Sequence, residues 1–459
     1  MLAEPSVLSL RRGARPRGRA ALWLEWATVQ AGPGTSAAAI QASSGTSAAA
    51  APGTSAAAVQ AGPDMSASLA GANRYDVIIV GAGPAGCSTA LNLVNLDPRW
   101  ASRVLVLDRA SFPRHKLCSG GLTGYGAKEL VGLRLELGVP SIAVASAHLR
   151  FESVSLVRCG RAGRPAFRVV RRDEFDHWLV QEARARGVPI RDGVSVISVE
   201  REPDGVALRT NTRTLRCTVV VGAAGATGVV RRQLGFRDRS RVGRALEVLT
   251  ACDPATTPEF AQGYAVFDFT PMLAGVRGYY WDFPSYVKGR AMMNRGIGDV
   301  RLDGDAPAPD LRANLAACLE LRGENLADHV VEGAPARWFD PDGLYAMPHA
   351  VLAGDEAGLD PLFGEGIGFA LAQGRVAAEA IALAFKTGDF SFAGYRERLL
   401  ADRTTSVLAR RARAARLFYS VRNPRLLRLV WRLGGPLLCL GIGGHARLSR
   451  QVLRLEGTR

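Results

Sequence analysis

The chain has 459 residues, of which 47% are hydrophobic, and a formal net charge of +16. This length favours two or three folding units with a sizeable core over one small domain. Seven scattered cysteines without a CxxC pair argue against a disulfide framework or a structural zinc site, so we predict no metal. Because no run of about 18 uncharged apolar residues occurs, we also expect no membrane-spanning helix.

Residues 1–72 differ in composition from the rest of the chain. The hexapeptide GTSAAA occurs three times, and Asp64 is the only charged residue between positions 31 and 70. Such a segment offers too little bulky apolar surface to offset the entropy of ordering it. We therefore predict a disordered, low-complexity leader, and Met65 is an alternative start to Met1.

A dinucleotide fingerprint opens the ordered region. An apolar run ending at Val80 predicts a buried parallel strand, and Gly81, Gly83 and Gly86 follow it, with Pro84 and Ala85 between them. A helical pattern, a second strand and the acid Asp108 complete a βαβ unit. The three glycines would allow a tight turn, close approach of a pyrophosphate and close helix–strand packing, and Asp108 would accept from ribose hydroxyls.

The next elements suggest a second domain inserted into the first. Residues 171–190 predict an amphipathic helix with an N-cap at Asp173, and 214–235 predict a strand, a glycine-rich turn and a helix start. Short alternating runs between about 243 and 335 then predict antiparallel strands. We assign 73–240 to the first part of a nucleotide-binding domain and 241–345 to an antiparallel-sheet substrate domain.

Residues 346–390 again predict a short strand, a loop and a long helix, as in the nucleotide-binding domain. A short apolar strand ends at Gly354 and Asp355, and a loop containing Gly364 leads to a helix beginning near Gly366. An acid in this position can hold a ribityl hydroxyl, and a helix N-terminus can stabilise negative charge on a reduced flavin. The pairing with the distant N-terminal fingerprint predicts FAD rather than NAD as the bound cofactor.

With these motifs in place, residues 73 to about 390 resemble the geranylgeranyl reductase family, which belongs to the hydroxybenzoate-hydroxylase-like flavoproteins. The resemblance rests on DVIIVGAGPAGC, LDRASFPRHKLCSGGL, RRDEFDHWL, GDEAGLDPLFGEGIGFAL and the family's Tyr-x-Trp-x-Phe-Pro motif. It implies an α/β fold. The fold would comprise a Rossmann-type FAD-binding domain with a parallel sheet, an α+β second domain with an antiparallel sheet, and a C-terminal helical tail.

The resemblance also implies roles for individual residues. The ADP half of FAD would be held by the three glycines, Asp108 and Arg109, and the rest of the cofactor by Gly120, Arg172, Gly354, Asp355, Gly364, Gly366 and Ile367. Cys118 would lie near the reactive face of the flavin. Tyr279, Trp281, Phe283 and Pro284 would line the substrate channel, and we predict Cys118, Tyr279 and Trp281 as the catalytic residues.

One departure from the family affects the electron donor. The family usually has Asp where this chain has Ala224, and that Asp is linked to contact with pyridine nucleotides. The donor therefore stays open between NAD(P)H and a ferredoxin-like protein, while the remaining FAD contacts are intact.

These residues together predict an FAD-dependent reductase that saturates isolated C=C bonds of a polyprenyl chain in a lipid or quinone. An isolated alkene must be protonated before it can accept hydride, and the rings of Tyr279 and Trp281 would favour the resulting cation. Two alternatives remain: a flavin-dependent monooxygenase or halogenase on the same fold, and a non-catalytic flavin-binding membrane electron carrier.

The basic tail, residues 391–459, predicts contact with a membrane surface. Residues 401–459 carry thirteen Arg and no Lys against two acids, a net charge of +11. A helix beginning at Pro424 and ending at 434–436 would place Arg422, Arg425, Arg428 and Arg432 beside Leu426, Leu429, Val430 and Leu433. We expect a cytoplasmic protein, peripheral on the inner face of the cell membrane, and no nucleic-acid partner because no nucleic-acid motif accompanies the charge.

Overall fold

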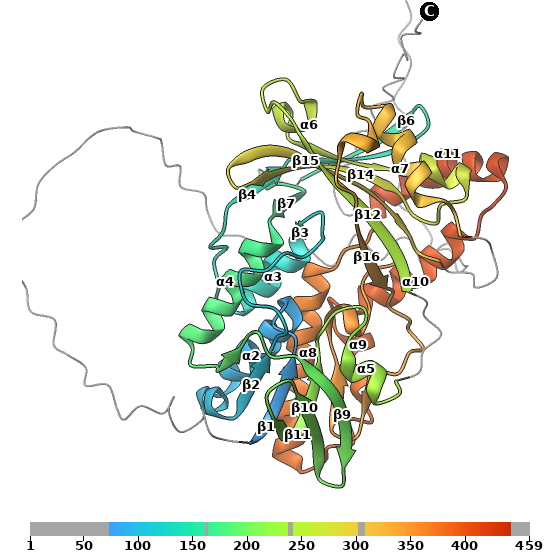
Figure 1. Cartoon of the computed structure of the whole chain (residues 1–459). Helices are drawn as coiled ribbons and strands as arrows, with labels where there is room; N and C mark the ends of the chain where they lie inside the picture. The colour runs from blue at the N-terminus through green and yellow to red at the C-terminus, as the bar shows by residue number, and fades with distance from the viewer. Residues whose placement is uncertain (1–72, 161–163, 237–241, 302–307, 442–459) are drawn as a thin grey trace, which may run out of the picture.

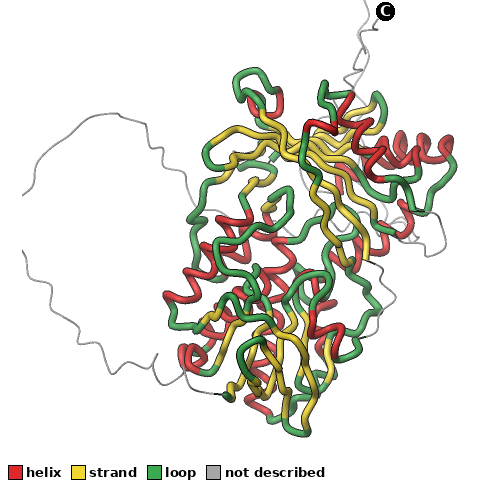
Figure 2. Tube along the Cα trace, viewed as in Figure 1, coloured by secondary structure: helices red, strands yellow, loops and turns green. Residues whose placement is uncertain are grey.

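The computed structural model describes residues 73–160, 164–236, 242–301 and 308–441. The predicted leader and the last residues of the tail lie outside these ranges. The described chain forms a nucleotide-binding half around a mainly parallel sheet and a second half around a mainly antiparallel sheet, with helices beside both (Figures 1 and 2). The predicted α/β fold class is confirmed.

The first sheet contains the strands predicted from the fingerprint. Its parallel core follows the order β18-β11-β1-β2-β8, with β17 at one edge and the antiparallel pair β9 and β10 attached to β11. The bounds are β1 (Arg74–Val80), β2 (Val104–Leu107), β8 (Ile190–Arg191), β9 (Val196–Glu202), β10 (Gly205–Thr210), β11 (Thr214–Gly222), β17 (Ala346–Met347) and β18 (Ala350–Leu352). The central strands are buried on both faces, which explains their continuous apolar sequence.

Helices α2 (Pro84–Leu96) and α8 (Ile367–Thr387) pack side by side against this sheet. The contact is close because Gly374 has no side chain: a Cβ there would lie 2.5 Å from the Ala85 carbonyl oxygen. The Ser88 hydroxyl also donates to the Leu371 carbonyl at 2.6 Å. Among the described helices, α8 alone is long and apolar enough to cross a membrane, but 78% of its most apolar part is buried within the protein.

The second sheet follows the order β16-β12-β15-β14-β13-β5-β6 and is antiparallel except between β13 and β5. It takes strands from both sides of residue 241, which is where the sequence suggested a domain boundary. The bounds are β5 (Ser146–Phe151), β6 (Val154–Cys159), β12 (Val242–Ala251), β13 (Tyr264–Asp268), β14 (Tyr280–Val287), β15 (Arg290–Asp299) and β16 (Glu332–Arg337).

One face of this second sheet packs on α7 (Leu311–Glu320), through Val248, Tyr280 and Ile297. The opposite face carries Trp281, Phe283 and other aromatic side chains. A small sheet of β3 (Gly121–Thr123), β7 (Phe167–Val170) and β4 (Ser141–Val144) contacts the second sheet through β14, and β3 also contacts α8. The remaining short helices are α3 (Gly124–Gly132), α5 (Val229–Gln233) and α6 (Pro258–Ala261).

Helix α4 (Arg172–Ala185) begins two residues earlier than predicted. Arg171 is its N-cap, and Asp173 lies in the first turn. An acid in the first turn is stabilised by the helix dipole without acting as the cap, so the sequence placed the helix correctly but shifted its start.

The tail forms α9 (Tyr395–Ala401), α10 (Ser406–Tyr419) and α11 (Pro424–Gly441). The predicted start of α11 at Pro424 is confirmed, but its predicted end is wrong because the helix continues through 434–436 to Gly441. Local Gly and Pro preferences are weak signals that surrounding structure can override. Leu427 and Trp431 are 1% exposed, so one side of α11 belongs to the aromatic core of the second half.

Candidate active site

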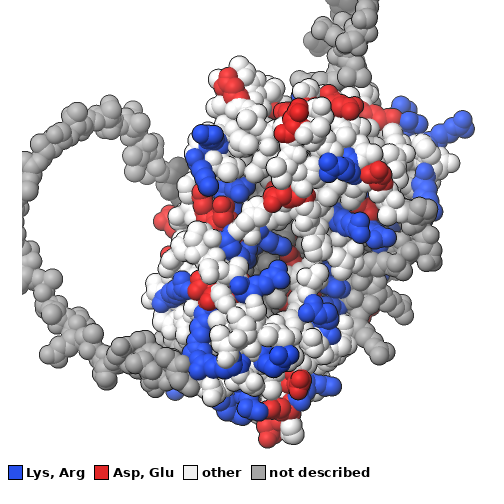
Figure 3. Space-filling model, viewed as in Figure 1, with Lys and Arg blue, Asp and Glu red and all other residues white. Residues whose placement is uncertain are grey.

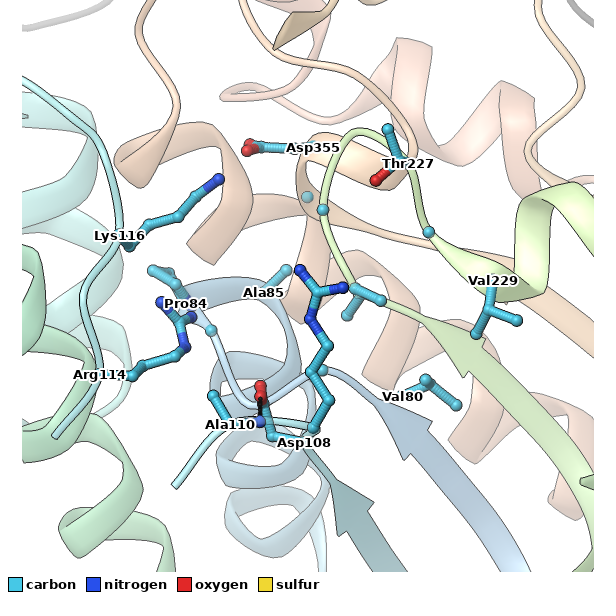
Figure 4. Close-up of a pocket in the computed structure, with 18 of the residues that line it drawn as sticks. Val80, Pro84, Ala85, Asp108, Ala110, Arg114, Lys116, Thr227, Val229 and Asp355 are labelled. Atoms are coloured by element: carbon cyan, nitrogen blue, oxygen red, sulfur yellow. Dashed lines mark hydrogen bonds between the residues drawn. The ribbon is translucent and has the colours of Figure 1, made fainter. Parts of the chain in front are cut away.

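A cavity of about 350 Å³ lies at the carboxyl ends of the parallel strands. Its walls come from the N-terminal fingerprint, from the loop after β2, from the turn after β11 and from the return segment. Figure 4 shows Asp108 and Asp355 on different sides of this space, with Lys116 and Arg114 projecting from a neighbouring loop. Ligands of open parallel sheets bind at this edge, so the position is that of a nucleotide site.

Two helices point their N-termini into this cavity without side-chain caps. The N-cap of α2 is Gly83 and that of α8 is Gly366, and neither has a side chain that could satisfy the first free N–H groups. Both residues line the cavity. Uncapped N-termini offer backbone donors and partial positive charge, which suit the pyrophosphate and the electron-rich edge of a flavin.

The fingerprint glycines have the separate roles that their spacing predicts. Gly81 has a φ of +111°, and a Cβ there would lie 2.2 Å from the Ala223 carbonyl oxygen. A Cβ on Gly86 would lie 1.8 Å from the Gly81 carbonyl oxygen, so Gly86 permits packing inside the turn and is not in the cavity wall. A Cβ on Gly83 would meet only Arg114, at 3.5 Å, and would occupy space left for the ligand.

Asp108 braces the fingerprint turn as well as lining the cavity. Its two carboxylate oxygens accept from the Ala82 N–H at 2.8 Å and from the Ala110 N–H at 2.9 Å. Each oxygen keeps a further acceptor position, so the carboxylate can still receive a ribose hydroxyl. Asp355 is the second acidic residue in the wall, in the turn after β18.

Basic side chains outnumber these two acids around the cavity. They are Arg109, Arg114, Lys116, Arg172 and Arg232, with His115 beside them. Lys and Arg also gather around the hollow on the face seen in Figure 3. Arg109 and Arg172 were predicted, whereas Arg114 and Arg232 were not, because single basic residues in loops carry no local signal of their own.

Asp176 of α4 orients two of these basic groups. It accepts from Arg172 at 2.8 and 2.9 Å and from Arg114 at 2.9 Å. Burial by itself would lower the pKa of Arg172, but the Asp176 carboxylate outweighs it and holds that pKa above the ordinary value. Arg172 therefore stays cationic at the cavity wall.

Most of the predicted cofactor residues meet at this cavity. Those in its wall are Gly81, Gly83, Pro84, Ala85, Asp108, Arg109, Arg172, Gly354, Asp355, Gly366 and Ile367. Gly120 and Gly364 are not in this wall. Gly120 has a φ of +82°, and a Cβ there would lie 2.0 Å from the Val170 carbonyl oxygen, so it serves a backbone turn. Gly364 lines a second cavity.

This second cavity, of about 100 Å³, adjoins the first, and Gly366 and Ile367 line both. Five aromatic side chains dominate its wall: Phe167, Phe267, Tyr279, Phe283 and Phe363. They come from the small sheet, the second sheet and the return segment. Ring pairs such as Phe267–Tyr279 and Phe267–Phe283 lie 5.4 and 5.1 Å apart between centroids, which fixes the shape of the wall.

Two predicted catalytic residues, Cys118 and Tyr279, lie in this wall. The Tyr279 hydroxyl donates to the Phe363 carbonyl, and burial raises the pKa of Tyr279 above its ordinary value, so the phenol stays neutral. The Cys118 sulfur accepts from the Gly120 N–H at 3.4 Å. Both residues are therefore held in fixed positions beside the apolar space.

Trp281 and Pro284 are not in this wall, unlike Tyr279 and Phe283. The Trp281 indole N–H donates to the Asn294 side-chain oxygen at 2.8 Å, and the Asn294 amide donates to the Cys118 carbonyl at 3.4 Å. Trp281 thus supports the Cys118 loop from behind the wall. A direct contact between its ring and the substrate stays a prediction.

Four polar residues of this cavity were not predicted. They are Ser119, Thr123, Glu365 and Arg411, and Arg411 comes from α10 in the basic tail. Glu365 stands inside a motif that the sequence already associated with the cofactor. Arg411 gave no such signal because it is one of thirteen arginines after residue 400.

Comparisons with known proteins identify an FAD-binding domain and related reductases. The FAD binding domain family matches residues 74–281. An uncharacterized protein of Methanosarcina barkeri is 30% identical over 324 residues, covering 69% of this chain and 77% of the relative. A menaquinone reductase of Mycolicibacterium smegmatis is 28% identical, covering 67% and 76%, and a geranylgeranyl diphosphate reductase of Rhodobacter capsulatus is 28% identical, covering 69% and 77%.

A solved structure shares the fold. The geranylgeranyl bacteriochlorophyll reductase-like protein of Thermoplasma acidophilum matches with a TM-score of 0.65 and 24% identity, over 78% of this chain and 91% of that one. The uncapped helix ends, the basic wall and the glycine cradle suit FAD, in agreement with the family match. The chain therefore belongs to the geranylgeranyl reductase-like family of FAD-dependent oxidoreductases.

Proposed function

We propose that this protein reduces isolated C=C bonds of a polyprenyl chain in a lipid or quinone. The observation that carries the proposal is the aromatic cavity, which shares the backbone at Gly366 and Ile367 with the FAD cavity. Relatives named as a menaquinone reductase and a geranylgeranyl diphosphate reductase support a prenyl chain as the substrate class.

The wall suits the chemistry of an unactivated alkene. Such an alkene has no electron-withdrawing group, so protonation at one carbon must generate a tertiary cation. FAD, when bound and reduced, supplies hydride. The Tyr279 and Phe283 rings would exclude water from the alkene. The face of an aromatic ring attracts a cation by about 2 kcal/mol or more when the cation and the ring are both desolvated.

The test is anaerobic incubation of the dithionite-reduced holoprotein with geranylgeranyl lipids and menaquinones, followed by mass spectrometry. We expect the mass to rise by two hydrogens for each bond reduced. A product that forms only with oxygen and contains a new oxygen or halogen atom would instead identify a monooxygenase or halogenase. Unchanged lipid together with a reversible flavin couple would identify an electron carrier.

We infer that the electron donor is NAD(P)H or a ferredoxin-like protein. The basic residues around the FAD cavity, including Arg114, Lys116 and Arg232, would attract either kind of anionic partner. Anaerobic mixing of the oxidised holoprotein with NADPH, NADH or a reduced ferredoxin distinguishes the two classes by the rate of flavin bleaching. Bleaching by none of them would contradict the inference.

Membrane contact is part of the same proposal, because a polyprenyl lipid must be taken from a bilayer. On α11, Leu426 is 48%, Leu429 is 50% and Leu433 is 67% exposed, and Arg425 and Arg432 are exposed beside them. We propose that this face lies on the anionic inner face of the cell membrane. Each Arg near such a surface contributes about 1 kcal/mol, and the leucines add apolar burial.

Arg428 belongs to the predicted row of arginines, but its guanidinium forms an ion pair with Glu152 at 2.8 Å and is therefore already neutralised within the protein. The membrane test therefore uses the leucines, which can be changed without breaking the core contacts of α11. We expect the full chain to co-sediment with anionic vesicles and the double variant L429S/L433S to bind at least tenfold more weakly. Leu321→Ser is the matched control, since Leu321 is 80% exposed at the C-terminal end of α7. Equal binding by all three proteins would contradict membrane contact through α11.

A further inference from the structure

A buried ion cluster forms one side of the aromatic cavity. It consists of Asp360, Glu365 and Arg411, and both Glu365 and Arg411 line the cavity. Asp360 is 0%, Glu365 8% and Arg411 7% exposed. Charged groups are rare in an apolar cavity wall, and the fold brings Arg411 here from a helix of the tail.

The cluster has two carboxyl groups for one guanidinium. The same Arg411 Nη1 atom lies 2.5 Å from an Asp360 oxygen and 3.0 Å from a Glu365 oxygen. With both acids ionised, the buried cluster would carry a net negative charge. One proton on a carboxyl group makes it neutral, which burial strongly favours.

The surroundings decide which acid takes that proton. Asp360 accepts from the Leu362 N–H at 2.9 Å and the Phe363 N–H at 3.3 Å in addition to Arg411, so both of its oxygens already accept hydrogen bonds. Among the described residues, the side chain of Glu365 has hydrogen bonds with Arg411 and with the Thr123 hydroxyl, and a hydroxyl can accept a hydrogen bond from a carboxylic acid as well as donate one to a carboxylate.

The other titratable side chains near Glu365 do not reverse this assignment. Tyr279 contributes a neutral phenol from the residue just before β14, and Tyr125 stacks on Phe369 with its ring near the Arg411 guanidinium. Burial is the main cause that raises the pKa of Glu365, and Asp360 adds to it, while Arg411 and Thr123 oppose it. Of the two acids, Glu365 is thus the one whose surroundings favour the protonated form.

Resting on the proposed function, we propose that Glu365 is the catalytic acid that protonates the alkene in the aromatic cavity. The Glu365 O–H bond breaks and a C–H bond forms at the less substituted carbon, which leaves the positive charge on the tertiary carbon. FAD, when bound and reduced, would supply the hydride that balances the saturation. Glu365 remains as a carboxylate beside Arg411 and regains its proton from water before the next turnover.

The geometry also gives Arg411 and Asp360 a positioning role. When Glu365 has lost its proton, Arg411 can pair with both carboxylates, so the anion formed in the reaction is not left uncompensated. Asp360 in turn prevents Arg411 from holding Glu365 permanently as an anion. The ratio of two acids to one base is therefore what makes the proton available.

Glu365→Gln tests the acid directly. The variant keeps the size and hydrogen-bonding capacity of the side chain, so we expect normal FAD content and melting temperature but at least a hundredfold loss of alkene reduction, the range of general-acid catalysis. Glu200→Gln, on the exposed strand β9, is the matched control and should keep the wild-type rate. An E365Q protein that reduces lipid at the wild-type rate would overturn the inference.

A second readout does not depend on turnover. The infrared difference spectrum of apoprotein at pH 8, wild type minus E365Q, should contain the C=O stretch of a protonated carboxyl, and wild type minus E200Q should not. In Asp360→Asn, Glu365 is the only carboxyl group of the cluster left to pair with Arg411, so the carboxylate form of Glu365 is favoured. The infrared band should therefore weaken, and the pH at which activity falls should decrease by about one pH unit or more. Absence of the band from the wild type would overturn the inference.

Failure of the proposed function gives a different result. In that case the wild-type holoprotein reduces no prenyl lipid, whichever form the infrared spectrum shows, and the assignment of Glu365 falls with it. An active wild type with an equally active E365Q would leave the function intact and remove only the role of Glu365.

Discussion

The two cavities meet at Gly366 and Ile367 but are built in opposite ways. The FAD cavity uses backbone: glycines, uncapped helix ends and a basic rim from loops. The neighbouring cavity uses side chains, mainly aromatic rings, with one buried ion cluster. A backbone site is specified by short motifs, because a glycine turn and the helix after it are contiguous, whereas a side-chain site is assembled from separate strands.

This difference teaches where substitutions act. In the FAD cavity, added atoms collide with main chain or with the cofactor, so even a methyl group is costly. In the aromatic cavity the rings support one another, and loss of one ring changes the chemistry more than the fold. The following predictions test this contrast, beginning with the largest effect.

Asp355→Ala should remove most of the bound FAD. Asp355 lines the cavity in the turn before α8, and alanine removes its acceptor atoms without adding bulk. The measurement is the flavin-to-protein absorbance ratio after purification. Asp204→Ala, in the exposed turn between β9 and β10, is the control and should retain FAD. A yellow, stoichiometric D355A protein would refute the role of Asp355.

Gly81→Ala and Gly83→Ala should separate folding from cofactor binding. At Gly81 the positive φ and the contact with Ala223 predict a loss of about 2–5 kcal/mol in the free energy of unfolding. At Gly83 nothing lies closer than Arg114, so the fold should persist while the Kd for FAD rises at least tenfold. Urea unfolding of both apoproteins and FAD titration of G83A test the pair, and equal stability losses would contradict the separation.

Tyr279→Leu should slow alkene reduction without loss of FAD. Leucine keeps apolar bulk but removes the ring face, and the loss of a cation–π attraction of about 2 kcal/mol corresponds to roughly thirtyfold. Trp281→Leu is the informative partner: it leaves Asn294 without its indole donor, so its main effect should be a lower melting temperature. If Trp281→Leu abolishes activity at unchanged stability, its ring acts in the chemistry after all.

Glu247→Gln should flatten the dependence of stability on pH. Glu247 is 4% exposed beside Asn294, and burial raises its pKa to about 7 from an unfolded value near 4.5. Its contribution to stability is therefore complete below pH 4.5 and is lost as pH rises through 7, by about 3 kcal/mol at most. Urea unfolding at pH 5 and 8 should show a smaller decrease for E247Q than for the wild type. An identical decrease would mean that Glu247 is ionised in the folded protein.

The sequence predicted the FAD cavity well because its parts are local. Gly81, Gly83 and Asp108 follow consecutive strands, and Asp355 follows a strand in a motif of the same kind. The aromatic cavity was predicted only in part. Period-two alternation put Tyr279, Trp281 and Phe283 on one face of the predicted strand, but it could not show which ring reaches the cavity.

That choice is made by the neighbouring strand. Gly296 lies opposite Trp281, and a Cβ there would lie 2.2 Å from the indole ring, so the ring occupies the space above Gly296 and turns to Asn294. Arg411 was beyond prediction for a similar reason. It meets Asp360 and Glu365 from 51 and 46 residues away, and only the packing of α10 determines which arginine arrives there.

The close packing of α2 on α8 has a consequence for biosynthesis. Ser88 and Leu371, which join these helices, are 283 residues apart, so at about 5–20 residues per second the ribosome makes the second half of the FAD cavity roughly 15–60 s after the first. The nascent fingerprint is therefore complete long before it can retain a flavin. FAD can therefore bind stably only late in synthesis. A truncated translation product that ends before α8 would contain the glycine motif but would not retain FAD.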